Sequence, residues 1–180
     1  MEFFAMHQLS ADLAVKTYKL YGENTIDLLY DDPYLLMDPG LEAPFGAVDQ
    51  FAISLGVAGD DPRRIEAGIL FELNYNLAAG HCFLPEDKLV AATAQLLTVG
   101  ENSVQNQLDS LAEAQRLVKT QLAGIQIVYL PELYTAEVYS ARKLLEFAKT
   151  EYPEPYRLEH LVQEASGSSG IQYSAQQSDA

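Results

Sequence analysis

The sequence contains little from which a disulfide or a membrane anchor could be built. Only one of its 180 residues is a cysteine, so no internal disulfide can form and we expect a reducing compartment. No apolar run approaches the ~20 residues that a membrane helix needs. The stretch 1–16 lacks the basic start of a signal peptide. We therefore predict a cytoplasmic protein without a membrane partner.

Positive charge is also scarce. The chain has 11 Lys and Arg against 26 Asp and Glu, which gives a net charge of −15. The acidic excess is spread along the chain, with 9 acids and 2 bases in residues 1–57 and 5 acids and 1 base in residues 151–180. DNA affinity comes largely from Lys and Arg that neutralise phosphates. This balance argues against strong independent DNA binding and leaves room only for weak local contacts.

No catalytic or metal-binding constellation stands out. The histidines lie far apart, at positions 7, 81 and 160, and one cysteine cannot build a zinc cluster. Cys82, which follows His81, is open to two interpretations, a nucleophile or metal ligand and a buried small apolar residue, and we favour the second. No G-x-x-x-x-G-K-[ST] motif occurs, so the sequence offers no loop to cradle ATP phosphates. We expect no catalytic residue, metal or cofactor here, and an independent small enzyme is the weakest interpretation.

What is present is a helical pattern centred on residues 60–85. Asp61 is a suitable N-cap and Pro62 suits a first helical position. Apolar residues then recur every four positions, at Ile65, Ile69, Leu73 and Leu77. Gly80 predicts the end of the helix, and a strand-like exit follows it.

Shorter helices are predicted before this central helix. Ser10 caps a predicted helix over 11–21 that Gly22 stops, and Asn24 is expected to cap the next one. A further helix is predicted over 47–55. Short helices that end at glycine predict stacked helical hairpins, so we assign residues 1–57 to a helix-hairpin-helix region, called here the helical-hairpin region.

The pattern after the central helix changes. Helices are predicted over 86–99 and 101–115, and two β-prone runs, 116–120 and 125–130, meet at a short connection that contains Gly124. Helix, helix, β-hairpin is the order of a winged helix. A long amphipathic helix over 131–149 completes what we call the winged-helix-like unit, residues 58–150.

Residues 151–180 are predicted to be a linker and lead-in. A last helix is predicted over 156–165, residues 166–170 have the composition of a flexible linker, and 171–180 is polar. The predicted fold class is mainly α, with tandem helix-hairpin-helix units followed by a winged-helix-like unit with one β-hairpin.

Several short motifs, taken in order, resemble the N-terminal region of the RecD-like ATP-dependent DNA helicases, the exodeoxyribonuclease V alpha-subunit type. The main motifs are Tyr21-Gly22-Glu23-Asn24, Asp32-Pro33-Tyr34-Leu35, Leu55-Gly56-Val57, Asp60-Asp61-Pro62-Arg63-Arg64-Ile65, Gly80-His81-Cys82-Phe83-Leu84-Pro85 and Tyr129-Leu130-Pro131-Glu132-Leu133-Tyr134. The resemblance extends over almost the whole chain.

The resemblance implies a full-length superfamily 1 helicase of DNA repair and recombination that moves 5′ to 3′ with ATP and Mg²⁺. This chain would be its non-catalytic N-terminal accessory region and would lack the ATPase motor. Gln177 would match the glutamine that reads adenine at the start of that motor.

A helix-hairpin-helix holds a DNA backbone through main-chain N–H groups beside its glycines. The family pattern is Gly-hydrophobic-Gly-Phe followed by Lys, and the matching stretch here runs from Gly40 to Gly46 with one extra residue. Pro44 replaces the second glycine and removes an N–H, Gly46 replaces the lysine, and Glu42 adds a negative charge. We favour packing over phosphate binding for this hairpin.

The remaining DNA-contact candidates are cations. Lys16 and Lys19 follow the first hairpin, and each could touch phosphate or be a solvated lysine on a helix surface. Arg63 and Arg64 could bind a phosphate, pair with the preceding aspartates or pair with the neighbouring unit. Arg116 and Lys119 lie on the predicted wing. The helix before the wing has no Lys or Arg, so a role in docking a protein is easier to assign to it than base reading.

Two functions from different classes follow. The first is an accessory region that positions DNA for a helicase through weak backbone contacts, alone or with a partner protein. The second is an acidic protein-interaction adaptor without nucleic-acid contact.

Overall fold

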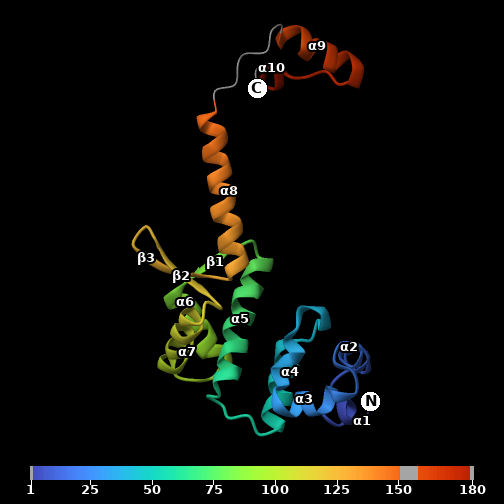
Figure 1. Ribbon diagram of the computed structural model, residues 1–180, viewed down its shortest axis with the longest axis vertical. Helices are drawn as coiled ribbons and strands as arrows, with labels where there is room; N and C mark the ends of the chain where they lie inside the picture. Colours follow the sequence, from blue (N-terminus) through green and yellow to red (C-terminus); the bar gives the residue numbers. More distant parts are fainter. Residues whose placement is uncertain (1, 151–157, 179–180) are drawn as a thin grey trace. The chain divides into compact units, whose positions relative to one another are not determined.

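A computed structural model describes residues 2–150 and 158–178, and it is mainly α-helical with one small antiparallel sheet (Figure 1). The predicted fold class is confirmed. The chain folds into two compact units, Met1–Val138 and Tyr139–Ala180. The domain boundaries drawn from the sequence remain predictions.

The helical-hairpin region consists of short helices separated by tight turns. Its α-helices are α1 (Glu2–Met6), α2 (Ala11–Tyr21), α3 (Thr25–Asp31) and α4 (Phe45–Ser54), and its 3₁₀ turns are η1 (Gly22–Asn24), η2 (Pro33–Met37) and η3 (Pro39–Leu41). Ser10 caps α2 as expected, since its Oγ accepts a hydrogen bond from the Leu13 N–H at 3.1 Å. The expected Asn24 cap is wrong: the Asn24 side chain makes no capping bond, and the Thr25 hydroxyl instead donates to the Gly22 carbonyl at 2.6 Å.

Helix α5 (Pro62–Ala78) is the longest helix of the unit Met1–Val138 that lies wholly within it. The predicted cap is confirmed, because Asp61 Oδ1 accepts the Arg63 N–H at 2.8 Å. Gly80 has φ +92°, a left-handed backbone that ends the helix. Gly68 lets α5 approach α6 (Glu86–Leu97) closely, because a Cβ at this position would lie 2.8 Å from Leu97 Cδ1.

The winged-helix-like unit contains one strand more than the predicted hairpin. Strand β1 (Phe83–Pro85) precedes α6 and α7 (Glu101–Glu113), and β2 (Val118–Leu122) and β3 (Ile125–Tyr129) follow them. The sheet is antiparallel in the order β1-β3-β2, with Leu84 opposite Val128 and Lys119 opposite the same residue on the other side. The strand-like exit after Gly80 is therefore the third strand of the wing.

One continuous apolar core joins the helical-hairpin region to the winged-helix-like unit. It extends from Phe4 of α1 to Leu130 after β3, and Ile69 of α5 and Leu108 of α7 are fully buried within it. Because α5 contacts both η2 of the first region and α6 and α7 of the second, it is the element on which both are assembled.

Helix α8 (Pro131–Lys149) has the predicted bounds. Its part in the unit Tyr139–Ala180 exposes large apolar side chains, among them Leu144, Leu145 and Phe147. No helix among the described residues is both long enough and apolar enough to cross a membrane.

The predicted flexible linker over 166–170 is wrong for most of its length, because helix α9 (Leu158–Ser169) includes residues 166–169. Serine hydroxyls satisfy the carbonyls at the end of this helix: Ser168 and Ser169 both donate to the Ala165 carbonyl. The predicted start of the last helix at residues 156 and 157 lies outside the described residues. A short helix, α10 (Ala175–Ser178), follows.

Candidate nucleic-acid interface

Lys16 of α2 contacts the hairpin at residues 40–46 through Glu42, and two carboxylates hold it. Its Nζ lies 2.6 Å from Glu42 Oε2 and 3.2 Å from Asp12 Oδ2. The hydrogen bonds to Glu42 and then Asp12 raise the Lys16 pKa. Glu42 has φ +53°, a left-handed conformation that turns the hairpin toward α2. The glutamate thus occupies the ammonium group that a phosphate would need.

The two hairpin glycines differ in what they offer to a ligand. The Gly40 N–H donates to Asp38 Oδ1 at 2.8 Å, so it is already used. Gly46 lies exposed in the first turn of α4, with no atom within 4 Å of the place where its Cβ would be. No described residue accepts the N–H of Phe45 or of Gly46. The start of α4 therefore has two N–H groups without an acceptor among the described residues, of which Gly46 belongs to an exposed residue and Phe45 to a buried one.

Lys19 lies exposed near the end of α2 and has no ion pair with a described residue. Within the described part of the chain, the other five cationic candidates each form an ion pair with a carboxylate, and Lys19 does not. Its ammonium group is therefore the most available of the predicted phosphate contacts.

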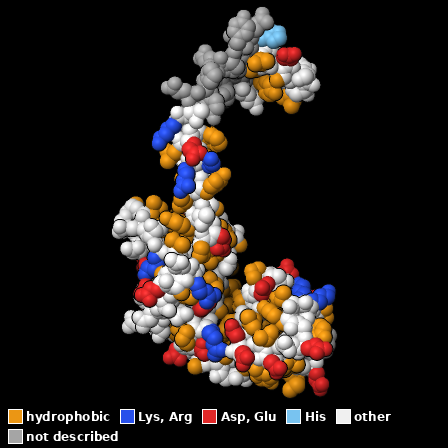
Figure 2. Space-filling view, in the orientation of Figure 1, with side chains coloured by type: hydrophobic (Ala, Val, Ile, Leu, Met, Phe, Trp, Pro, Cys, Tyr) orange, Lys and Arg blue, Asp and Glu red, His pale blue; other side chains and the backbone are white. Residues whose placement is uncertain are grey.

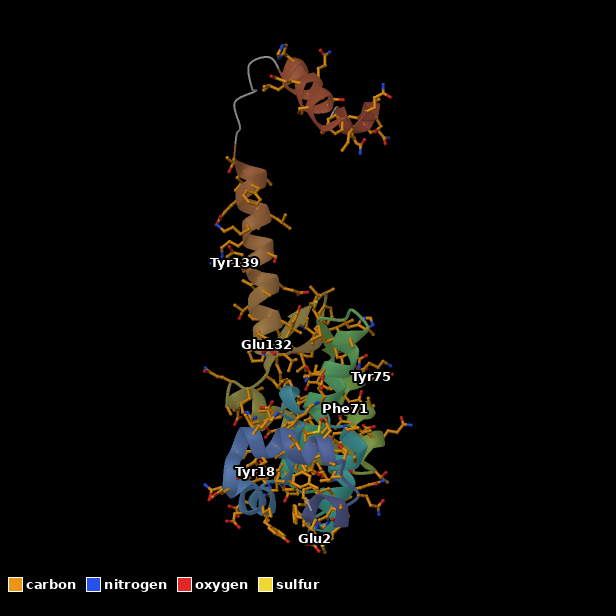
Figure 3. All side chains as sticks on the ribbon, turned by 90° about the vertical axis from the view of Figure 1, so that its right-hand side faces the viewer. Glu2, Tyr18, Phe71, Tyr75, Glu132 and Tyr139 are labelled. Atoms are coloured by element: carbon orange, nitrogen blue, oxygen red, sulfur yellow. The ribbon has the colours of Figure 1, made fainter. Side chains whose placement is uncertain are left out.

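Arg63 and Arg116 come together at a groove of about 690 Å³. Arg63 bonds Asp61 through Nη2 at 2.9 Å and donates to the Asp31 carbonyl, whereas Arg116 pairs with Glu66. Phe71 of α5 also lines the groove, and Figure 3 places Tyr75 further along the same helix. Both arginines are half-exposed but already bound to carboxylates.

Arg64 lies inside the protein with 6% of its surface exposed. Its guanidinium binds Asp49 of α4 through two bonds of 2.8 Å and donates to the Gly59 carbonyl at 2.6 Å and to the Leu97 carbonyl at 3.0 Å. Tyr34 donates to the same aspartate at 2.8 Å. Of the alternatives for Arg64, the structure favours pairing with the neighbouring unit, because the side chain does not reach the surface.

Lys119 of β2 is held against the two helices before the wing. Its Nζ lies 2.7 Å from Glu86 Oε1 of α6 and 2.6 Å from Asp109 Oδ1 of α7. Gln105 of α7 donates to Glu86 at 2.6 Å in the same cluster. The hydrogen bond from Lys119 lowers the Asp109 pKa. This helix face is therefore a closed ionic cluster, which fits the expectation that it does not read bases.

Gln177 lies in α10 and forms a capping box with Ser174. The Ser174 N–H donates to Gln177 Oε1 at 3.0 Å, and the Gln177 N–H donates to Ser174 Oγ at 3.3 Å. The resemblance implies that the Gln177 side chain contacts adenine, but in this structure its oxygen accepts a hydrogen bond from the Ser174 backbone.

Cys82 is half-buried beside Glu137 of α8. A hydrogen bond to the Glu137 carboxylate raises the Cys82 pKa, and the Tyr129 hydroxyl donates to the same carboxylate at 2.7 Å. A raised pKa disfavours the thiolate that nucleophilic chemistry needs. Among the described residues, no group of three His, Cys, Asp or Glu side chains is arranged to hold a metal ion.

Sequence reasoning missed the carboxylates that decide these sites. Asp49, Glu66 and Glu86 pair with Arg64, Arg116 and Lys119 from positions 15 to 50 residues away. No periodicity or motif predicts such partners, since the pairing depends on how the helices pack. Acidic side chains are scattered over the N-terminal helices in Figure 2, so composition alone could not identify the pairs.

The turn at residues 40–46 follows η2 and precedes α4, and η2 packs against α4, which defines the class, a helix-hairpin-helix region. Residues 1–83 match the family described as the ATP-dependent RecD2 DNA helicase HHH domain. The resemblance to an N-terminal helix-hairpin-helix region of a RecD2-type helicase is therefore confirmed for this part of the chain. The match ends at the first residue of β1, so the resemblance of the later motifs remains a prediction.

Proposed function

We propose that this chain is the DNA-positioning accessory region of a RecD2-type, 5′ to 3′ ATP-dependent DNA helicase of repair and recombination. The observation that carries the proposal is the match of residues 1–83 to the helix-hairpin-helix domain of that family. In this proposal the region contacts the phosphate backbone of DNA and not the bases, and it binds weakly. The protein acts in the cytoplasm.

The contact surface runs from the end of α2 to the start of α4. The free N–H groups of Phe45 and Gly46 and the ammonium group of Lys19 are donors suited to phosphate oxygens. Lys16 joins them only when its ion pairs with Glu42 and Asp12 open. The arrangement supports weak backbone contact because so few donors are free.

ATP and Mg²⁺ act at a motor domain in this proposal. The present sequence has no phosphate-binding loop of the G-x-x-x-x-G-K-[ST] type. In the motor, the Gln177 side chain releases the Ser174 N–H and forms a hydrogen bond with adenine instead. The enzymatic activity belongs to the motor, and the region described here directs DNA to it.

Fluorescence anisotropy with labelled single-stranded and duplex DNA tests the proposal. We expect affinity to fall as salt rises from about 50 to about 200 mM, with a shallow log–log slope near −1 that corresponds to about one phosphate neutralised by Lys19. Lys19→Ala should weaken binding to all sequences equally. Glu42→Gln should strengthen binding, because it removes the nearer of the two carboxylates that hold Lys16 and leaves only the exposed Asp12.

The matched control is Glu113→Gln, which removes one exposed negative charge at the end of α7, away from the hairpin. If it strengthens binding as much as Glu42→Gln does, only the net charge matters and the hairpin site is wrong. If the unaltered chain does not bind at about 50 mM salt, DNA positioning itself is wrong.

A second candidate function is the acidic adaptor that docks a protein partner. The observation that favours it is that Lys16, Arg63, Arg64, Arg116 and Lys119 are all paired with carboxylates. A chain of net charge −15 with its cations neutralised presents acidic surface to a basic partner. Absence of DNA binding at low salt would leave this function in place of the first.

A further inference from the structure

The tip of the β2–β3 hairpin carries two large aliphatic side chains in solvent. Leu122 and Ile125 are 52% and 55% exposed, and they form the last cross-strand pair before the turn. The turn residues Ala123 and Gly124 have φ +50° and +84°. Two successive left-handed residues are typical of the type I′ turn, which matches the twist of paired strands. The tip is therefore a short, well-ordered apolar ridge.

The part of the hairpin beyond Lys119 is also free of charge. No Asp, Glu, Lys or Arg occurs from residue 120 to residue 130, although the chain carries 37 such residues, 26 of them acidic. The pair adjoining the tip, Gln121 and Gln126, presents exposed neutral amides. The turn extends beyond helices α6 and α7 (Figure 1). DNA can therefore approach this tip without meeting an acidic side chain on the hairpin itself.

An uncharged apolar hairpin tip is a liability for a protein in water. Strand β2 is an edge of the sheet, and exposed edges are commonly protected by a charged residue or a proline, neither of which occurs on β2 after Lys119. The cation that β2 does carry, Lys119, is bound to Glu86 and Asp109 at the base of the hairpin. The ridge is thus left unprotected, as expected of a contact surface.

We infer that the tip is a wedge that packs against the terminal base pair of a DNA duplex where it meets a single strand. Leucine and isoleucine side chains are among those that proteins insert at base steps to unstack them. The neutral amides of Gln121 and Gln126 can bond sugars or base edges beside the wedge. This inference rests on the proposed function and adds to it the DNA structure that is recognised, a junction between duplex and single strand.

The test uses the 180-residue chain and a forked duplex with 2-aminopurine at the last base pair. Binding should raise the fluorescence of the probe because the wedge unstacks it, and the fork should bind more tightly than a single strand of the same length. The double variant Leu122→Thr/Ile125→Thr retains β-propensity while removing the aliphatic ridge. It should bind the fork roughly tenfold more weakly, because the apolar contact of the aliphatic ridge with the terminal base pair is lost. The fluorescence rise should disappear, and single-strand affinity should not change.

The matched control is Ile53→Thr/Leu96→Thr, which removes an exposed isoleucine and an exposed leucine elsewhere, at 49% and 38% exposure. It should leave both readouts unchanged. Thermal melts establish that each variant is folded, and the single variant Ile125→Thr replaces the double if the double is not.

Three outcomes would overturn the inference. If the tip variant binds the fork and raises the fluorescence as the unaltered chain does, the wedge is wrong while DNA positioning stands. If the unaltered chain binds no DNA, both are wrong. If sedimentation shows a dimer that only the tip variant loses, the ridge joins two copies of the chain and is not a DNA wedge.

Discussion

Lys16 of α2 extends to Glu42 in the helical-hairpin region, and Lys119 of β2 extends to Glu86 and Asp109 in the winged-helix-like unit. The first pair lies at the surface, where Glu42 is 75% exposed, whereas Glu86 of the second is only 15% exposed. A surface ion pair is worth little and opens easily, but a partly buried cluster with several partners does not. Of these two paired lysines, Lys16 therefore has the ion pair that opens more easily.

The two regions also differ in the chemical groups that they leave without a partner. The helical-hairpin region leaves backbone N–H groups at the start of α4, which suit a phosphate, and the winged-helix-like unit leaves an apolar tip, which suits a base. Arg64 binds Asp49 of the first region and the Leu97 carbonyl of the second. Arg64 therefore adds a buried polar junction to the apolar core that joins the two regions within the unit Met1–Val138.

The largest expected effect comes from breaking that junction. Arg64→Leu leaves the Asp49 carboxylate buried without its partner, and we expect a loss of ~3–5 kcal/mol of unfolding free energy. Urea denaturation followed by circular dichroism measures it. Arg64→Leu/Asp49→Leu should recover much of the loss, because no uncompensated charge remains. A loss below ~1 kcal/mol in the single variant would show that the buried pair does not join the two regions.

The next effect concerns the bond between the wing and α8. Tyr129→Phe removes the hydroxyl that donates to Glu137, at an expected cost of ~1.5 kcal/mol. Burial, followed by the bond to Glu137, raises the Tyr129 pKa from 10.0 to about 12. Because the neutral form is favoured in the folded protein, the stabilisation is complete below pH 10 and is lost as the pH rises through about 12.

The measurement for Tyr129 is the difference in unfolding free energy between the unaltered chain and Tyr129→Phe as a function of pH. Using the difference removes the contribution of the other tyrosines. The difference should shrink steadily above pH 10. A difference that stays constant through this range would contradict the bond to Glu137 as its source.

A smaller effect is expected from the ionic cluster of the wing. Lys119→Met should cost ~1 kcal/mol, because the pair is partly exposed and screened. The Asp109 pKa is held below 3.8 by Lys119, so this stabilisation is present above that value and is lost as the pH falls through the lowered pKa. Acid unfolding curves of the two chains should therefore converge at low pH, and parallel curves would exclude the cluster.

The smallest effect compares the two lysines directly. Glu42→Gln leaves Lys16 with only Asp12, a carboxylate that is 75% exposed at 3.2 Å, and should raise DNA affinity about threefold at low salt. Asp109→Asn should leave affinity unchanged, because Glu86, which is only 15% exposed, still holds Lys119 at 2.7 Å. Anisotropy titrations on one DNA measure both. Equal gains in the two variants would show that the regions do not differ in the availability of their lysines.

Much of the local structure could be predicted from the sequence. The caps at Ser10 and Asp61, the stop at Gly80 and the hairpin around Gly124 are set by interactions within a few residues, and each lies where the sequence predicts it. The composition of residues 166–170 wrongly predicted a flexible linker. Serine hydroxyls there donate to a carbonyl of their own helix, and the helix continues to Ser169. The third strand was only suggested by the sequence, because Phe83–Pro85 becomes a strand through pairing with β3.

The order of the helices before residue 150, the β2–β3 hairpin, the acidic balance and the resemblance carried by the motifs follow from the amino-acid sequence alone. Which cations are free, in contrast, depends on the tertiary structure. Lys16 and Lys19 are three positions apart on the same helix, yet one is paired with Glu42 and the other has no described partner. The reason is physical: local propensity depends on neighbours in sequence, but an ion pair depends on atoms that packing brings within about 4 Å.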